Sequence, residues 1–289
     1  MEVLTKSLTV AGRKAHRRLW TRAELARLAA SPDPVARRIA VALGAVIDDR
    51  LDPEERGWVE RIESLRARLL SSGDEVPIVD YGAGDPELDL TDETMSAGRV
   101  EARRVADICR SAAKPPIWAR LLLKLVREVR PTHSVELGTS LGISAAYQCA
   151  ALELNRHGTL VSLEGAPALV EVARGHLAEL GLERATIVPG RFQDTLDDVL
   201  ASEAPIDYAF VDGHHDRDAT LEYFERLLPS AAEDAVLIFD DISWSPGMRH
   251  AWRTIAAHPR VGVAVDLFKV GVCTLSASGG KENYRIAID

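Results

Sequence analysis

The stretch that decides the fold is HSVELGTSLGISAAYQCAALEL, residues 133–154, followed by the apolar run TLVSL at 159–163, which ends on Glu164. The first run is short and β-branched, and it meets a turn containing Gly138 and Gly142. A helix-like run follows at once, and the second apolar run comes after it. This order of strand, turn, helix and strand predicts a βαβ unit with parallel strands.

The same stretch predicts a site for an adenosine-containing cofactor. Glycines in the turn let the backbone approach a ligand, and Glu164, 22 residues after Gly142, can accept hydrogen bonds from two ribose hydroxyls. The pattern E-x-G-x-x-x-G opens on Glu136, whereas a dinucleotide-binding turn reads G-x-G-x-x-G. An acid there would repel a pyrophosphate and suit the cationic S-adenosylmethionine (SAM). The alternative is a generic glycine turn without a ligand.

Composition narrows the class of protein. The chain has 289 residues, 46% of them hydrophobic, and a formal net charge of −9, which disfavours a nucleic-acid partner. No apolar run is long enough for a membrane span, and the N-terminus lacks an export signal, so we expect a cytoplasmic protein. The three cysteines, Cys109, Cys149 and Cys273, lack metal-binding spacing and are expected to be buried thiols.

The chain is predicted to divide into three parts. Residues 1–75 form a helical cap or oligomerisation region, with helices expected from Thr21 to about Ser71 and a Thr-x-x-Glu cap at Thr21. Residues 76–113 form an irregular connector and a lead-in helix at about Ala97–Ala112. The IVDYGAG segment of this connector resembles a second cofactor turn but lacks a following helix, so we interpret it as part of the cap. Residues 114–289 form the cofactor-binding domain.

The periodicity of the third part predicts the fold class. Short apolar runs alternate with helical patterns from Ile117 onward, as in a mostly parallel sheet covered on both faces. Near the end, Val261–Phe268 and Val270–Leu275 are joined too tightly for parallel pairing and must be antiparallel. We therefore expect an α/β fold with a Rossmann-like, doubly wound sheet that ends in an antiparallel hairpin, preceded by an N-terminal helical extension.

The motifs ELGTSLGIS and FDDI-x-W-S, with DYGAG before them, resemble those of class I SAM-dependent methyltransferases. Within that group the chain is similar to the small-molecule O-methyltransferases of the catechol O-methyltransferase type. The resemblance extends back to about Val76. It implies methyl transfer from SAM to a hydroxyl oxygen of a small metabolite, with a divalent cation such as Mg²⁺ as a possible aid. Natural-product biosynthesis and a homodimer are expected settings.

The resemblance also implies roles for particular residues. The cofactor-binding set comprises Glu136, Gly138, Ser140, Glu164, Phe192, Gln193 and Asp212. The metal-binding set comprises Asp212, Asp240 and Asp241. The related metal-dependent enzymes have Asp-Asn where this chain has Asp240-Asp241, but the oxygen ligands still suit a hard cation. The alternative for this pair is the N-cap of a helix.

The catalytic residues are expected to be Asp212 and His215. His215 lies three residues after Asp212, where catechol-type enzymes place a lysine base, and imidazole can accept a proton near neutral pH. The alternative is that His214 and His215 are ordinary loop residues. Trp244, Trp118 and Tyr81 are candidates for the substrate pocket, although Trp118 and Trp252 also fit a core.

Three other functions stay open. One is metal-independent methylation of nitrogen or of a peptide. Another is a nonenzymatic SAM-binding scaffold, which would not need converging carboxylates. A NAD-binding oxidoreductase is disfavoured by the glycine spacing and by the terminal hairpin.

Overall fold

The central sheet brings together the carboxyl ends of the parallel strands that position the site. The computed structural model describes residues 10–80, 99–276 and 280–288. Its main strands are β3 (His133–Leu137), β4 (Thr159–Glu164), β5 (Ala185–Pro189), β6 (Ile206–Val211), β7 (Ala231–Phe239), β8 (Val261–Asp266), β9 (Gly271–Leu275) and β10 (Glu282–Arg285). Their order in the sheet is β10-β8-β9-β7-β6-β3-β4-β5. Strands β5, β4, β3, β6 and β7 are parallel, which confirms the predicted doubly wound sheet.

The C-terminal end of the sheet contains both a confirmed hairpin and a strand that the sequence did not reveal. Strands β8 and β9 pair antiparallel, and β9 also pairs antiparallel with β7. Strand β10 adds to the edge, parallel to β8. Its four residues, ENYR, are mostly polar, and only Tyr284 is buried. A polar edge strand lacks the apolar run that marks an interior strand.

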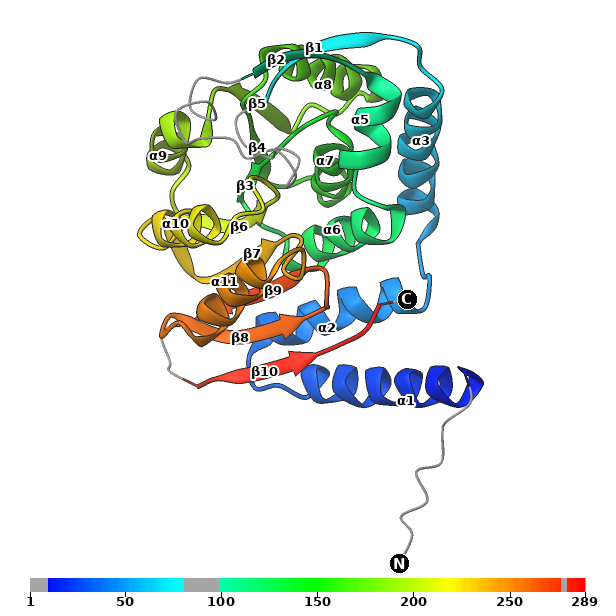
Figure 1. The fold of residues 1–289 in the computed structure, drawn as a ribbon. Coiled ribbons are helices and arrows are strands. Elements are labelled where there is room, and N and C mark those ends of the chain that lie inside the picture. The colour runs from blue at the N-terminus through cyan, green and yellow to red at the C-terminus, as the bar shows by residue number, and fades with distance from the viewer. Residues whose placement is uncertain (1–9, 81–98, 277–279, 289) are drawn as a thin grey trace, which may run out of the picture.

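Helices cover both faces of the sheet (Figure 1). One face packs under α9 (Phe192–Glu203), α10 (Arg217–Leu227) and α11 (Pro246–Ala257). The core on the other face includes α6 (Pro116–Val129), α7 (Ile143–Asn155) and α8 (Pro167–Leu180). The same core extends into α2 (Pro34–Ile47), α3 (Pro53–Leu70) and α5 (Val105–Ala112). The N-terminal helices are therefore continuous with the main hydrophobic core.

The first helix begins earlier than predicted. Helix α1 spans Val10–Ala29, so Thr21 lies in its interior and does not cap it. The Thr21 hydroxyl instead donates to the Ala287 carbonyl at 3.4 Å, in the C-terminal segment. Helix α1 packs against α2 and β10. The prediction of a helix cap at Thr21 was wrong, because the Thr21 hydroxyl makes a tertiary hydrogen bond to the C-terminal segment.

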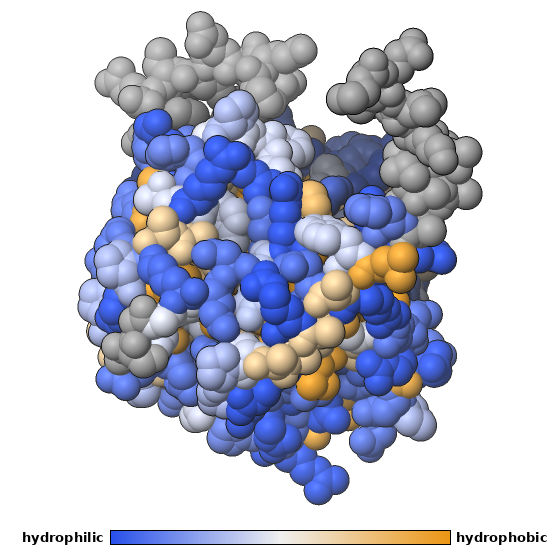
Figure 2. All heavy atoms as spheres, turned by 90° about the horizontal axis from the view of Figure 1, so that it is seen from below, coloured by the Kyte–Doolittle hydropathy of each residue, from blue (hydrophilic) through white to orange (hydrophobic). Residues whose placement is uncertain are grey.

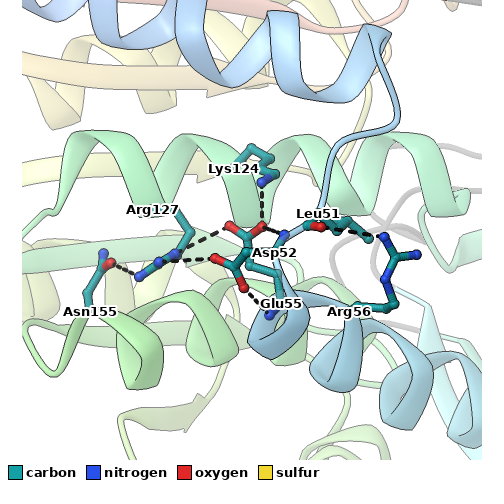
Figure 3. A network of polar contacts seen from close by, with 7 residues as sticks. All are labelled: Leu51, Asp52, Glu55, Arg56, Lys124, Arg127 and Asn155. Carbon is teal, nitrogen blue, oxygen red and sulfur yellow. Dashed lines mark hydrogen bonds and ion pairs between the residues drawn. The ribbon is translucent and has the colours of Figure 1, made fainter.

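Helix α3 is fixed by a network of polar groups around the buried Glu55 (Figure 3). Asp52 and Glu55 form a capping box, with the Glu55 amide donating to Asp52 at 2.8 Å and Glu55 accepting from the Asp52 amide at 2.9 Å. Lys124 of α6 pairs with Glu55 at 2.5 Å. Arg127 contacts Glu55 at 3.4 Å and donates to Asn155 of α7 at 2.6 Å. The network ties α3 to α6 and α7.

The connector contains two strands that were not predicted. β1 (Glu75–Asp80) and β2 (Arg99–Arg104) pair antiparallel, with Glu75 opposite Arg104. The expected helix therefore begins at Val105, not near Ala97. Ile78–Asp80 of the IVDYGAG segment belong to β1, and Tyr81 and the residues after it lie outside the described part of the chain.

The surface is mainly polar. Figure 2 shows the face formed around α1 as largely hydrophilic, with a short band of hydrophobic residues. Large exposed apolar side chains include Leu19, Val41, Leu70 and Trp244. Cys109, Cys149 and Cys273 are buried and unbridged, as predicted. In the portions of the chain that the structure describes, no helix has the length and apolar character to cross a bilayer.

Candidate active site

A cavity of about 300 Å³ opens at the carboxyl ends of the central strands. It lies where the strand order reverses between β3 and β6, the position at which open α/β sheets bind ligands. Its lining includes Gly138, Ser140, Glu164, Phe192, Asp212, His214, His215 and Asp241. Most of the residues predicted from the sequence are therefore brought together.

Gly138 allows the two central strand ends to approach each other. It has φ +104°, and a Cβ atom there would lie 2.1 Å from the Asp212 carbonyl oxygen. A side chain would therefore separate the turn after β3 from the end of β6. This close approach places the Gly138 turn beside Asp212, at the mouth of the cavity.

Glu164 is fixed by backbone donors. One carboxylate oxygen accepts from the Ser140 amide at 2.7 Å, and the other accepts from the Ala166 amide at 2.9 Å. Burial raises the pKa of Glu164, while these amides oppose the rise. The carboxylate lines the cavity in a defined orientation. It can accept hydrogen bonds from vicinal hydroxyls such as those of a ribose.

Glu136, which was predicted to bind the cofactor, is not among the residues that line the cavity. It is fully buried, and its carboxylate accepts from the Gln148 amide group at 2.7 Å and the Ser162 hydroxyl at 2.5 Å. Burial raises the pKa of Glu136 to about 7. Its position on β3 directs the side chain into the protein, beneath the turn, where it ties β3 to β4 and α7.

Phe192 and Gln193 lie on different sides of α9, with Phe192 facing the cavity and Gln193 facing solvent. Phe192 lines the cavity, and its ring packs edge-on against His214 and Tyr223, with centroids 5.6 and 5.7 Å away. Gln193, which was predicted to make a polar contact with the cofactor, is exposed on α9 and is not part of the lining. Phe192 offers a flat apolar surface to a ligand in the cavity.

The predicted carboxylates at the ends of β6 and β7 are bound to a lysine. Lys114 Nζ lies 3.1 Å from Asp212 Oδ1 and also contacts Asp240 Oδ2. Asp240 is buried, whereas Asp241 lines the cavity wall. Within the described residues, no three His, Cys, Asp or Glu side chains are placed to share a metal ion. The Lys114 ammonium lies against two of the three acids that were predicted to hold a metal ion.

The two histidines have different surroundings. His214 Nδ1 lies 2.7 Å from the Tyr223 hydroxyl, in the aromatic group around Phe192. His215 Nε2 lies 3.6 Å from Asp212 Oδ1, and its ring is 6.4 Å from that of Trp244. His215 is thus the histidine that faces the carboxylates.

The predicted aromatic residues are only partly at the site. Trp244 is 64% exposed beside His215, whereas Trp118 and Trp252 are buried in the core. Tyr81 lies outside the described residues. Ser245, not Asp240 or Asp241, caps α11, so the alternative of a capping role for those acids is wrong.

Loop residues around the cavity adopt an uncommon backbone conformation. Ser140, His214, His215 and Asp241 have φ values of +48°, +61°, +39° and +48°. Such values cost energy for residues with a Cβ atom and concentrate at functional sites. The strain lies in the three loops that follow β3, β6 and β7.

Several lining residues come from the connector or directly follow it, and they were not predicted. Arg103 of β2, Ser111 of α5, Ile78 of β1 and Lys114 all line the cavity. Ile78 opens the IVDYGAG segment, whereas the other three have no glycine turn or cofactor motif beside them. Lys114 had one indirect signal, because three acids expected to converge require a positive counter-charge.

Comparison with known proteins agrees with this geometry. Residues 135–242 match the family described as "Methyltransferase domain". This part of the chain is therefore similar to a methyltransferase domain. The matched segment runs from β3 to just past Asp241 and includes every predicted cofactor-binding residue. No curated protein matches the chain.

Solved structures share the fold of the methyltransferase domain. An O-methyltransferase from Bacillus cereus, in complex with S-adenosylhomocysteine (SAH), has a TM-score of 0.50 and 23% identity, covering 57% of this chain and 84% of that one. An O-methyltransferase from Streptomyces achromogenes that is involved in tomaymycin synthesis, in complex with SAM, has a TM-score of 0.50 and 23% identity, and the match covers 57% of this chain and 82% of that one. An SAH-bound methyltransferase from Podospora anserina has a TM-score of 0.50 and 15% identity, and the match covers 58% of this chain and 81% of that one.

Proposed function

We propose that this protein transfers a methyl group from SAM to a hydroxyl oxygen of a small molecule. The observation that carries the proposal is Glu164, held by the Ser140 and Ala166 amides in a cavity at the switch point of a methyltransferase domain. A carboxylate fixed at the end of the second strand is suited to a ribose. The solved structures of the same fold include proteins with SAM or SAH bound.

The residues of the cavity fit SAM better than a dinucleotide. The lining holds Glu164, Asp212 and Asp241 beside Arg103, Lys114 and Arg191, and its acids are suited to an ammonium and a sulfonium. Gly138 and Ser140 would lie against the methionine half, Glu164 would hold the ribose, and Phe192 would flank the adenine. A pyrophosphate would instead meet carboxylates in a site without a G-x-G-x-x-G turn.

The chemistry is an in-line displacement. SAM supplies an electrophilic methyl group: the acceptor oxygen forms the new O–CH₃ bond, while the S–CH₃ bond breaks and its electron pair remains on sulfur. The protein aligns the two groups and receives the hydroxyl proton. His215 Nε2 is the proposed proton acceptor, with Asp212 at 3.6 Å to stabilise the resulting imidazolium.

Calorimetric titration with SAH and with NAD tests the cofactor assignment. We expect one SAH site per chain and no NAD binding. Incubation with SAM and a panel of phenols and alcohols, read by mass spectrometry, should then give a product heavier by one CH₂ unit. NAD binding without a response to SAH would contradict the proposal, and fragmentation of the product would identify the methylated atom.

His215→Gln tests the proton acceptor. The variant should bind SAH like the wild type but lose roughly 10²- to 10⁴-fold in turnover, the usual contribution of general-base catalysis. His250→Gln is the matched control, because His250 is exposed on α11 and does not line the cavity. Equal turnover in both variants would remove His215 from the mechanism. The homodimer and the cytoplasmic location stay predictions.

A further inference from the structure

The environment of Lys114 differs from that of an ordinary surface lysine. Its side chain is 11% exposed, and its ammonium contacts Asp212 and Asp240, whose side chains are 11% and 4% exposed. These acids follow the neighbouring parallel strands β6 and β7. The lysine comes from the segment between α5 and α6, far from both in sequence. A buried charge is favourable only with such partners.

The backbone holds Lys114 in this place. Helix α5 ends at Ala112, and α6 begins at Pro116, so Lys114 precedes two successive prolines. Proline fixes its own φ and restricts the residue before it to extended conformations. The Pro115 carbonyl also accepts from the Trp118 and Ala119 amides at 3.0 Å each. The ammonium is therefore delivered by a rigid segment that packs on the core.

We propose that the Lys114 ammonium takes the place that a divalent cation would take between Asp212 and Asp240, and that it presents an N–H donor to the acceptor oxygen. A cation such as Mg²⁺ needs oxygen ligands at about 2.0–2.1 Å in near-octahedral geometry. The ammonium lies against two of the oxygen-bearing groups that would provide them. An ammonium has three N–H donors, and Lys114 lines the cavity, so the group can offer a donor to a ligand there.

The charge balance is consistent with this assignment. Asp212 and Asp240 carry two negative charges and Lys114 carries one positive charge, so this group retains one negative charge beside the cavity. Asp241 on the wall adds another. A doubly charged metal ion would neutralise the pair, whereas Lys114 leaves negative charge that attracts a sulfonium. The donor would stabilise negative charge that develops on the acceptor oxygen as its proton leaves.

The inference has two parts. The role of Lys114 as an N–H donor to the acceptor oxygen rests on the proposed methyl transfer. The position of its ammonium where a divalent cation would lie does not, and it is tested without measuring turnover. Mn²⁺ binding, followed by the electron paramagnetic resonance signal of the free ion, is measured for the wild type, for Lys114→Met and for Lys281→Met. Lys281 is exposed near β10, so its variant changes the net charge equally but away from the site.

The wild type and Lys281→Met should lack a stoichiometric Mn²⁺ site. Lys114→Met should gain Mn²⁺ affinity at least tenfold, and adding Asp240→Asn to it should abolish the gain. Circular dichroism reports whether each variant is folded, and Lys114→Gln serves if Lys114→Met does not fold. The claim that the Lys114 ammonium occupies the position of a divalent cation would be overturned by a stoichiometric Mn²⁺ site in the wild type. It would also be overturned by a folded Lys114 variant whose Mn²⁺ affinity does not rise.

The donor half is tested with an acceptor found by mass spectrometry. Lys114→Met should lose at least a hundredfold in turnover while SAH affinity changes less than tenfold, and Lys114→Arg should recover part of the loss. Wild-type turnover in Lys114→Met would overturn the donor role. Failure of the proposed function would instead appear as absent SAH binding in the wild type, with the Mn²⁺ result unaffected.

Discussion

Two buried lysine–carboxylate groups occur among the residues that the structure describes, and they differ in what surrounds them. Lys124 pairs with Glu55 among α3, α6 and α7, and Lys114 pairs with Asp212 and Asp240 at the cavity. The lysine side chains are 10% and 11% exposed, and Glu55 and Asp240 are each 4% exposed. Burial alone therefore does not distinguish a structural ion pair from a functional one.

The distinction lies in the remaining partners. Glu55 also receives the Asp52 amide and contacts Arg127, so its carboxylate is satisfied within the helical layer (Figure 3). Lys114 and Asp212 line a cavity that the fold leaves open. A buried ion pair that is fully enclosed contributes to the stability of the native arrangement, whereas one beside a cavity can interact with a ligand.

The largest expected effect is on stability, and it separates the two groups. Lys124→Met should lower the free energy of unfolding by about 3–5 kcal/mol, because it leaves Glu55 buried with one cation fewer. Lys114→Met should cost less, since water in the cavity can solvate Asp212. Urea denaturation measures both, with Lys281→Met as the control. Equal losses of unfolding free energy in the two variants would show that water in the cavity does not solvate Asp212 when Lys114 is removed.

Glu136 extends the comparison to a buried acid that accepts hydrogen bonds from two neutral donors, Gln148 and Ser162. Its folded pKa of about 7 lies above that of an unfolded glutamate, so the native state binds a proton more tightly. Wild-type stability should fall, relative to Glu136→Gln, as the pH rises from about 4.5 to about 7, by up to about 3 kcal/mol. Denaturation at pH 5 and pH 8 checks this. A difference between the two proteins that does not change with pH would contradict it.

Glu164 is a carboxylate held by amides, not by a lysine, and its effect should appear in binding. Glu164→Ala should weaken SAH binding by roughly 1–3 kcal/mol, the range for hydrogen bonds to a charged acceptor. Calorimetry measures it, and Glu171→Ala on the exposed side of α8 is the matched control. Unchanged SAH affinity in Glu164→Ala would move the ribose to another part of the cavity.

The smallest expected effect belongs to Trp244, which is exposed beside the cavity residue His215. Because its side chain is 64% exposed, Trp244→Ala should change the free energy of unfolding by less than about 0.5 kcal/mol. SAH affinity should stay the same, while KM for the acceptor should rise, since the ring stands beside His215. An altered SAH affinity with an unchanged KM would place Trp244 at the cofactor end instead.

Some of the site was predictable because its signals are local. Gly138, Ser140 and Glu164 follow from a turn and a strand end within one βαβ unit. The burial of Glu136 was not predictable, because a sequence pattern does not say whether a strand residue faces a ligand or the core. The exposure of Gln193 was not predictable for a similar reason, since its neighbour Phe192 takes the inward position on α9.

The sequence by itself determined the parallel sheet, the terminal hairpin, the glycine turn and the acids at the strand ends, because these depend on hydrophobic periodicity and on residues close in the chain. Only the tertiary structure decided that Lys114 meets Asp212 and Asp240, that β1 and β2 flank the cavity, and that the N-terminal helices share the main core. Those contacts join segments separated by many residues. They form because buried charges and apolar faces need partners, and the choice of partner is made when the chain packs.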